Sequence, residues 1–146
     1  MIRLYEEEDV EAILEVWYQA SLLAHSFLTD AFLAEERVKM REVFLPNSTT
    51  WVYEDDGQVV GFLSMVGNEV GGLFVHPAKH RHGVGRALMD KAFSLCDFLE
   101  LDVFEKNNVG RAFYAKYGFV PIDQYREEQT GEMTIRLRYE GKSGTL

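Results

Sequence analysis

The sequence predicts a mixed α/β (α+β) protein in which helices cover both faces of one central sheet. Segments rich in β-branched and aromatic residues, typical of strands, alternate with segments whose apolar residues recur at helical spacing. The chain of 146 residues has the length of one domain, and 47% of its residues are hydrophobic, which is enough to build a core. We therefore expect residues 1–146 to form a single domain, with a disordered tail at residues 141–146.

The first third of the chain predicts one strand followed by two helices. Residues 2–5 form a short apolar run that fits an edge strand. Behind an acidic turn, apolar residues then recur at helical spacing: Val10, Ile13, Leu14, Trp17 and Leu22. The second helix should begin near Thr29 or Asp30, because either side chain can cap a helix, and should end before Pro46.

Three strands should follow. Residues 49–54 and 58–66 are strand-like, and the turn sequence Asp55-Asp56-Gly57 between them predicts a hairpin. A further strand at residues 69–76 comes after a Gly67-Asn68 turn. These segments would build the first half of the sheet.

The pattern changes from strand to helix after Pro77, which breaks the strand. A basic loop that contains glycines leads into one apolar helical face: Val84, Ala87, Leu88, Ala92 and Leu95. The single cysteine, Cys96, falls on the apolar side of this pattern, which favours a packed thiol over a nucleophile. Residues 99–104 predict another strand.

The last part of the chain predicts a short helix and a final hairpin. The helix covers residues 108–117 and is closed by Gly118, at the position after a helix end where glycine is favoured. Residues 119–129 and 132–139 are strand-like and surround a Thr130-Gly131 turn. The expected order is strand, helix, helix, three strands, helix, strand, helix and two strands.

The charge distribution restricts the partners of the chain. A formal net charge of −9 argues against nucleic acid, because binding there rests on many cation–phosphate contacts. No segment approaches the roughly 18 apolar residues of a membrane span, and the acidic N-terminus is unlike a signal peptide, so we expect a soluble, cytoplasmic protein. The positive charge gathers in one basic island: Lys79, His80, Arg81, His82 and Arg86. This island predicts one anionic ligand, with a solvated basic turn as the alternative.

The basic island also has the backbone arrangement of an anion site, because a strand, a glycine-rich turn and a helix N-terminus follow one another. Free N–H groups of residues 82–86 would point at a common spot, which suits a pyrophosphate. The segment is neither a P-loop nor a dinucleotide-binding GxGxxG motif. A metal site formed by His76, His80 and His82 is rejected, because no nearby cysteine or carboxylate completes a tetrahedral set.

At this point the sequence resembles the GCN5-related N-acetyltransferase (GNAT) family. That family's signature, [Q/R]-x-x-G-x-[G/A], corresponds here to His80-Arg81-His82-Gly83-Val84-Gly85. The second half of the family pattern corresponds to Asn107, Phe113-Tyr114 and Gly118-Phe119, and the resemblance covers residues 49–120. The chain departs from the signature at its first position, where His80 replaces Gln or Arg.

The resemblance implies the fold and the cosubstrate. It implies a mostly antiparallel mixed sheet of six to seven strands, flanked by about four helices, in which two parallel strands splay apart and hold acetyl-coenzyme A (acetyl-CoA). The backbone of Phe74 and Val75 would bind the pantetheine arm, and no metal is implied. The phosphate contacts are expected from seven residues: His80, Arg81, His82, Gly83, Val84, Gly85 and Arg86. Asn107 would lie near the pantetheine, although it is also a good helix cap.

The implied reaction is acetyl transfer to the primary amine of a small molecule or peptide. Tyr114 matches the tyrosine that resembling enzymes use to protonate the CoA thiolate, and a core tyrosine is the alternative. Because an amine with a pKa of about 10.4 is almost fully protonated at pH 7, a base or a water chain is expected. Glu69 and His25 are the two candidate bases, and a surface carboxylate and a packed histidine are their respective alternatives.

Other possibilities stay open at this stage. Trp17, Phe27 and Phe32 are candidates for the walls of the acceptor pocket, although aromatic core is their default interpretation. A non-catalytic acyl-CoA-binding module is the alternative function. The sequence leaves open a homodimer and the use of longer acyl-CoA molecules, and it predicts neither a nucleic-acid nor a membrane partner.

Overall fold

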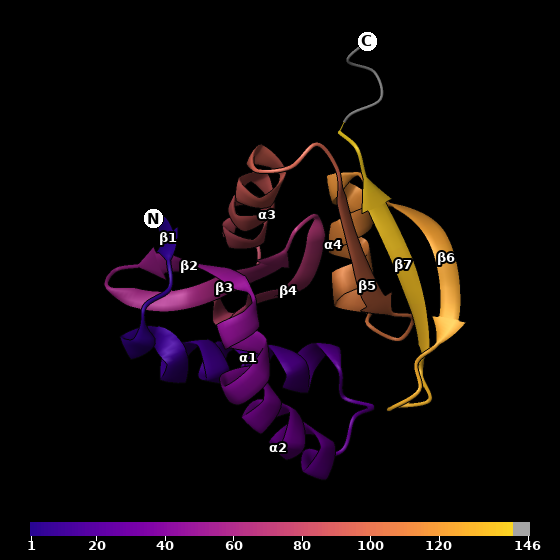
Figure 1. Ribbon diagram of the computed structural model, residues 1–146, viewed down its shortest axis with the longest axis horizontal. Coiled ribbons are helices and arrows are strands. Elements are labelled where there is room, and N and C mark those ends of the chain that lie inside the picture. The colour runs from indigo at the N-terminus through magenta and orange to yellow at the C-terminus, as the bar shows by residue number, and fades with distance from the viewer. Residues whose placement is uncertain (142–146) are drawn as a thin grey trace.

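The computed structural model describes residues 1–141 and contains one seven-stranded sheet with the strand order β1-β2-β3-β4-β5-β7-β6 (Figure 1). The strands are β1 (Ile2–Leu4), β2 (Thr49–Asp55), β3 (Gln58–Val66), β4 (Glu69–Val75), β5 (Leu99–Phe104), β6 (Val120–Arg126) and β7 (Met133–Tyr139). The helices are α1 (Val10–Ala24), α2 (Asp30–Lys39), α3 (Val84–Ser94) and α4 (Asn108–Tyr117). β4 and β5 run parallel, and the other neighbouring strands are antiparallel. The predicted fold class is confirmed, and the predicted disordered tail at 141–146 lies, apart from Gly141, outside the described residues.

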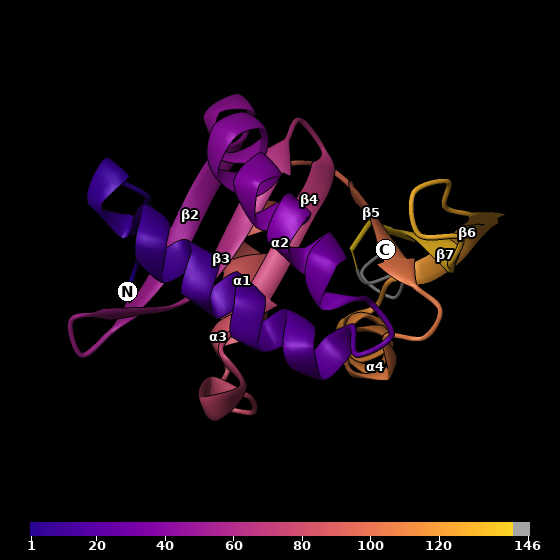
Figure 2. The same cartoon turned by 90° about the horizontal axis from the view of Figure 1, so that it is seen from below.

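The sheet separates two apolar cores, because successive side chains of a strand point to opposite faces. α1 and α2 cover one face of the sheet (Figure 2). Ile13 and Leu14 pack with Phe62 on this face. α3 covers the other face, where Leu88 and Met89 pack, and α4 adds aromatic rings there. Within residues 1–141, no helix is long and apolar enough to cross a membrane.

The helix ends follow the predicted capping residues. Thr29 caps α2, since its Oγ1 accepts a hydrogen bond from the N–H of Phe32 at 3.1 Å. Asn107 caps α4 in the same way, through Gly110 N–H at 2.8 Å. α2 is continued by a π-helical turn (Met40–Phe44) and a 3₁₀ turn (Leu45–Asn47), so helical backbone extends to Asn47, just before β2.

Two predicted boundaries are wrong. α3 ends at Ser94, so Cys96 lies beyond the helix rather than on its apolar face, and its thiol is partly buried 3.7 Å from the carbonyl of Gly67. The last hairpin has a longer loop than predicted, between Arg126 and Met133. The carboxylate of Glu127 accepts hydrogen bonds from loop N–H groups at 2.7 and 3.0 Å, which folds the loop back on itself.

β4 and β5 separate almost as soon as they meet. Their register contains one pair, Glu69 with Glu100, and the strands diverge beyond it. β4 is also irregular at Gly71, where the register with β3 shifts and the ring of Phe44 packs so closely that a Cβ would lie 2.8 Å from it. The splayed strands implied by the resemblance are therefore present.

Candidate active site

The gap between the splayed strands opens into a cavity of about 790 Å³. β4 and β5 form its floor, α1 and α2 cover one side, and the loop of the β6–β7 hairpin borders the other. The predicted residues Trp17, His25, Phe32, Phe74, Asn107 and Tyr114 all line it. Segments far apart in sequence thus meet in one cleft of the size that binds small molecules.

The backbone of β4 offers free polar groups to this cleft. In an antiparallel pair the hydrogen-bonding direction alternates along the strand, and the N–H of His76 bonds to Val60 of β3 at 2.9 Å. Phe74 follows the same alternation and bonds toward β3, so Leu73 and Val75 turn their backbone groups toward the gap. Leu73 was missed by the sequence analysis, although the alternation of a strand could have indicated it. The ring of Phe74 lines the cleft and stacks on Phe62 at 5.4 Å.

Tyr114 presents a free hydroxyl to the cleft. Its ring is held by edge contacts with Phe113 at 5.5 Å and Phe119 at 5.6 Å. Within residues 1–141, no protein group accepts a hydrogen bond from the hydroxyl. Burial raises the pKa of Tyr114 to about 12, so the phenol is protonated at neutral pH and can donate a hydrogen bond.

Asn107 connects α4 to the segment after α1. Its Oδ1 accepts the capping hydrogen bond from Gly110, and its Nδ2 therefore faces Nε2 of His25 at 3.3 Å. An amide nitrogen can only donate, so Nε2 of His25 is the acceptor and the ring proton sits on Nδ1. The predicted N-cap is confirmed, and Asn107 also lines the cleft, while its contact with the pantetheine stays a prediction.

His25 is a neutral, packed ring in this structure. Its ring contacts those of Phe104 at 5.2 Å, Phe27 at 5.9 Å and Phe74 at 6.5 Å. Burial lowers the pKa of His25 to about 4, because the charged imidazolium loses its hydration. With Nε2 already bonded to Asn107, the ring is poorly suited to accept a proton near pH 7.

The lowered pKa of His25 predicts a pH-dependent stability. In the unfolded chain a histidine titrates near 6.5, so protons bind the unfolded state first as the pH falls. The contribution is fully present above pH 6.5, and about 3 kcal/mol is lost between pH 6.5 and about pH 4. His25→Gln keeps an acceptor for Asn107 but has no group that titrates in this range. We expect its unfolding free energy, measured with denaturant at several pH values, to lack this fall between pH 6.5 and about pH 4. The same pH dependence of the unfolding free energy in the wild-type protein and in His25→Gln would contradict a neutral, buried His25.

The glycine loop ends in free N–H groups at the start of α3. Within the described chain, no backbone acceptor takes the N–H groups of Gly83, Val84, Gly85 or Arg86, whereas that of His82 bonds to Lys79 at 3.4 Å. The free N–H groups were predicted at residues 82–86. The structure leaves four of them, at residues 83–86, because the N–H of His82 is already bonded. Because these groups lie at the positive end of the helix dipole, they can bind an anion.

The side chains of the loop divide into two roles. Arg81, His82 and Arg86 are exposed, and Arg81 has a left-handed backbone with φ of 67°. His80 instead turns back, and its Nε2 bonds to the carbonyl of Val75 at 3.1 Å. The residue that departs from the family signature therefore connects the loop to the splayed strand.

The two glycines of the loop have different surroundings. Gly83 has φ of 80° and open space where a Cβ would lie. Glycine therefore allows the left-handed backbone conformation at this position and leaves the adjacent space empty. A Cβ on Gly85 would lie 3.2 Å from the ring of Phe113, so Gly85 allows α3 and α4 to approach each other.

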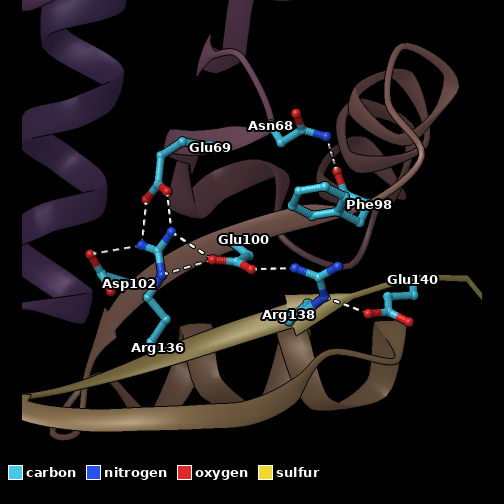
Figure 3. A network of polar contacts seen from close by, with 8 residues as sticks. All are labelled: Asn68, Glu69, Phe98, Glu100, Asp102, Arg136, Arg138 and Glu140. Carbon is cyan, nitrogen blue, oxygen red and sulfur yellow. Dashed lines mark hydrogen bonds and ion pairs between the residues drawn. The ribbon is translucent and has the colours of Figure 1, made fainter.

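Glu69 lies at the closed end of the splay, in a network of ion pairs (Figure 3). Both of its carboxylate oxygens accept hydrogen bonds from Arg136, one of them at 2.8 Å. The same guanidinium bonds to Glu100 at 2.9 Å and lies 3.3 Å from Asp102. Glu69 does not line the cleft, and its place fits a role in joining β4 to β5 and β7. Its predicted role as the base stays a prediction.

Asp102 is a cleft carboxylate that the sequence analysis missed. It stands two residues after Glu100 on the same face of β5 and lines the cavity. Burial raises the pKa of Tyr125 on β6, and the negative charge of Asp102 nearby adds to the rise. The alternation of β5 could have indicated Asp102, but not which face of β5 would border the gap.

Ser21 is a second missed residue, one helical turn before His25 on α1. Its hydroxyl lines the cleft, is fully buried and has no hydrogen-bond partner within residues 1–141. A buried hydroxyl without a partner costs about 1–3 kcal/mol. A polar group of a bound ligand would remove that cost.

Comparisons with known proteins agree with this geometry. The family model described as "Acetyltransferase (GNAT) domain" matches residues 46–121. Peptidyl-lysine N-acetyltransferase YiaC of Escherichia coli (strain K12) is 33% identical over 131 residues, which cover 89% of this chain and 90% of YiaC. Peptidyl-lysine N-acetyltransferase YjaB of the same strain is 33% identical over 143 residues, which cover 96% of this chain and 97% of YjaB.

Solved structures show the same fold. The solution structure of apo YjaB from Escherichia coli has a TM-score of 0.87 and 29% identity, and it covers 97% of this chain and 98% of YjaB. The PaiA N-acetyltransferase of Thermoplasma acidophilum, solved in complex with coenzyme A, has a TM-score of 0.71 and 19% identity, with 95% and 98% of the two chains covered. The similarity to PaiA shows the fold alone, whereas the family model and the sequence relatives show the family to which the chain belongs. The chain belongs to the GNAT family and is an N-acetyltransferase.

Proposed function

We propose that this enzyme transfers the acetyl group of acetyl-CoA to the side-chain amine of a lysine in a peptide or protein. The observation that carries the proposal is the cleft between the splayed strands, because it contains a protonated phenol, a carboxylate and free strand backbone. Two relatives of nearly full-length coverage are named peptidyl-lysine N-acetyltransferases, which supports lysine over other amines.

The coenzyme would bind along a path defined by free backbone groups. The N–H groups of residues 83–86 would hold the pyrophosphate, with Arg81 and Arg86 adding charge. The pantetheine would run along Leu73 and Val75, where β4 no longer pairs with β5. The carbonyl of Val75 is bonded to His80, so Val75 would offer its N–H group. A backbone N–H there would stabilise the oxyanion formed from the thioester carbonyl.

The acceptor must lose a proton before it attacks. A lysine amine with a pKa of about 10.4 costs about 4–5 kcal/mol to deprotonate at pH 7. Three carboxylates, Glu36, Asp102 and Glu127, and one cation, Lys39, line the cleft, so it attracts a cationic side chain. We assign the base to Asp102, directly or through water, because Asp102 lines the cleft and Glu69 does not, and because His25 is neutral and already bonded to Asn107.

Tyr114 would act on the departing sulfur. The amine nitrogen forms a bond to the carbonyl carbon, the carbon–sulfur bond breaks, and the thiolate leaves. The pKa of the Tyr114 phenol, about 12, is higher than the pKa of a thiol, about 8–9. The phenol therefore stabilises the leaving thiolate chiefly by donating a hydrogen bond to it. The attacking nitrogen releases one proton and the thiolate takes up one, so the products are the acetylated amine and the free thiol of coenzyme A.

The assignment of the base predicts different results for two carboxylate variants. Asp102→Asn should lower kcat/KM for a lysine peptide by about 100-fold, because general-base catalysis contributes on that order. Glu69→Gln should lower the unfolding free energy through its lost ion pairs and change kcat/KM by less than about threefold. Steady-state kinetics and urea unfolding of both variants measure this. The reverse pattern would return the base to Glu69.

The acceptor class is tested by free thiol release from acetyl-CoA with a matched panel. A peptide with an internal lysine and a blocked N-terminus should support turnover, with one acetyl group on the lysine by mass spectrometry. The same peptide with the lysine replaced by arginine is the control. Turnover with small amines alone would contradict the lysine proposal, and binding of acetyl-CoA without any turnover would indicate a non-catalytic module.

We also propose that the chain acts as one acetyltransferase domain and works in the cytoplasm. Its single sheet runs from β1 near the N-terminus to β7 near the C-terminus, so no part of the described chain folds separately. Acetyl-CoA and newly made proteins are both present in the cytoplasm, which supports this location.

A further inference from the structure

Lys39 places an amine of the enzyme's own chain in the acceptor cleft. It lies in the last turn of α2 and, among the residues that line the cleft in the described part of the chain, it is the one lysine. The cleft-lining residues of α2 are spaced as one helical face: Phe32, Leu33, Glu36 and Lys39. Lys39 therefore lies on the α2 wall of the cleft in which we propose that the acceptor lysine binds.

The ammonium group of Lys39 is only weakly held. Its Nζ lies 3.9 Å from Glu36, and 53% of its side chain is exposed. Ion pairs of this kind contribute little, and a lysine stem of four carbons changes rotamer easily. Asp102 lines the same cleft as Lys39.

We propose that Lys39 is acetylated by its own active site, an inference that rests on the proposed lysine acetyltransferase function. The Nζ of Lys39 forms a bond to the acetyl carbon and the carbon–sulfur bond of acetyl-CoA breaks. The amine gives up its proton to Asp102 or water, and the thiolate takes up a proton, so the products are acetyl-Lys39 and free coenzyme A. No reactant beyond acetyl-CoA is needed.

The other lysines of residues 1–141 provide internal controls. Lys79 and Lys106 are ion-paired at 3.0 Å with Asp55 and Glu132, and Lys91 lies 4.2 Å from the centre of the Trp51 ring. Neither these three lysines nor the fourth, Lys116 on α4, lines the cleft. Lys106 is the sharpest control, because it lies 5.5 Å from the ring of Phe27, which itself contacts His25 beside the cleft.

The experiment incubates the full chain with acetyl-CoA and follows each lysine by peptide mass spectrometry, with the blocked lysine peptide in parallel reactions. Lys39 should be modified at least about tenfold faster than Lys106, and the rate per enzyme molecule should not change over a hundredfold range of enzyme concentration. Tyr114→Phe should slow it by at least about tenfold, which a non-enzymatic reaction would not show. Lys106→Arg should leave the rate at Lys39 unchanged.

Different outcomes separate this inference from the proposed function. Peptide acetylation without modification of Lys39 overturns the inference and leaves the function intact. A rate at Lys39 that rises in proportion to enzyme concentration overturns it as well, because the reaction is then between molecules. Modified Lys39 with no acetylated peptide supports the inference and removes the peptide acceptor.

Discussion

Replacement of Tyr114 with phenylalanine is expected to lower kcat by about 100- to 1,000-fold, with the Kd for acetyl-CoA changed by less than about threefold. The variant loses one hydroxyl, which has no protein partner within residues 1–141 and faces the cleft. The aromatic contacts with Phe113 and Phe119 do not need the hydroxyl, so the fold should be preserved. Stopped-flow thiol release and calorimetric titration with acetyl-CoA measure the two effects separately.

Tyr117 provides the matched control for this variant. It lies one turn later on α4, and its hydroxyl donates a hydrogen bond to Asp90 of α3 at 2.6 Å, away from the cleft. Tyr117→Phe should therefore weaken the packing of α3 against α4 slightly and leave kcat unchanged. Unchanged turnover in Tyr114→Phe would remove that residue from the reaction.

Replacement of Gly83 with valine is expected to raise the Kd for coenzyme A by at least about 100-fold, which corresponds to about 2.7 kcal/mol. The residue has φ of 80° at the N-cap of α3, next to the free N–H groups of residues 84–86. A branched side chain would disfavour this backbone conformation and would occupy the open space in which the pyrophosphate is expected. Calorimetric titration with coenzyme A tests the prediction.

Gly57→Val is the control that distinguishes the effect of backbone strain from the loss of coenzyme A binding. It has φ of 78° in the turn between β2 and β3, and like Gly83 it has no atom within 4 Å of an added Cβ. Gly57→Val should therefore lose a similar unfolding free energy, about 1–2 kcal/mol, and should bind coenzyme A normally. Normal binding by Gly83→Val would contradict the pyrophosphate site.

Local signals in the sequence predicted most of the fold. The N-caps Thr29 and Asn107 begin helices through hydrogen bonds within three residues, and strand alternation is equally local, so both can be recognised without a structure. The loop of the last hairpin escaped prediction because Glu127 looks like a solvated strand residue until its carboxylate bonds to the loop backbone.

The catalytic side of the cleft depends on contacts that sequence spacing does not reveal. Glu69 appeared to be a free carboxylate, but its partner Arg136 lies 67 residues away. A histidine in water has the pKa of a base, but burial of His25 against Phe27 and against two rings from distant segments, Phe74 and Phe104, lowers that pKa. Asp102 enters the cleft because β4 turns away from β5, which is a property of the whole sheet.

The central claim is that the cleft between β4 and β5 holds the thioester beside Tyr114, and a crystal structure of the acetyl-CoA complex tests it most directly. The claim predicts the thioester sulfur within about 3.5 Å of the Tyr114 hydroxyl oxygen, and the pyrophosphate on the N–H groups of residues 83–86. A coenzyme whose sulfur lies outside the cleft, or whose pyrophosphate lies away from the start of α3, would contradict the claim.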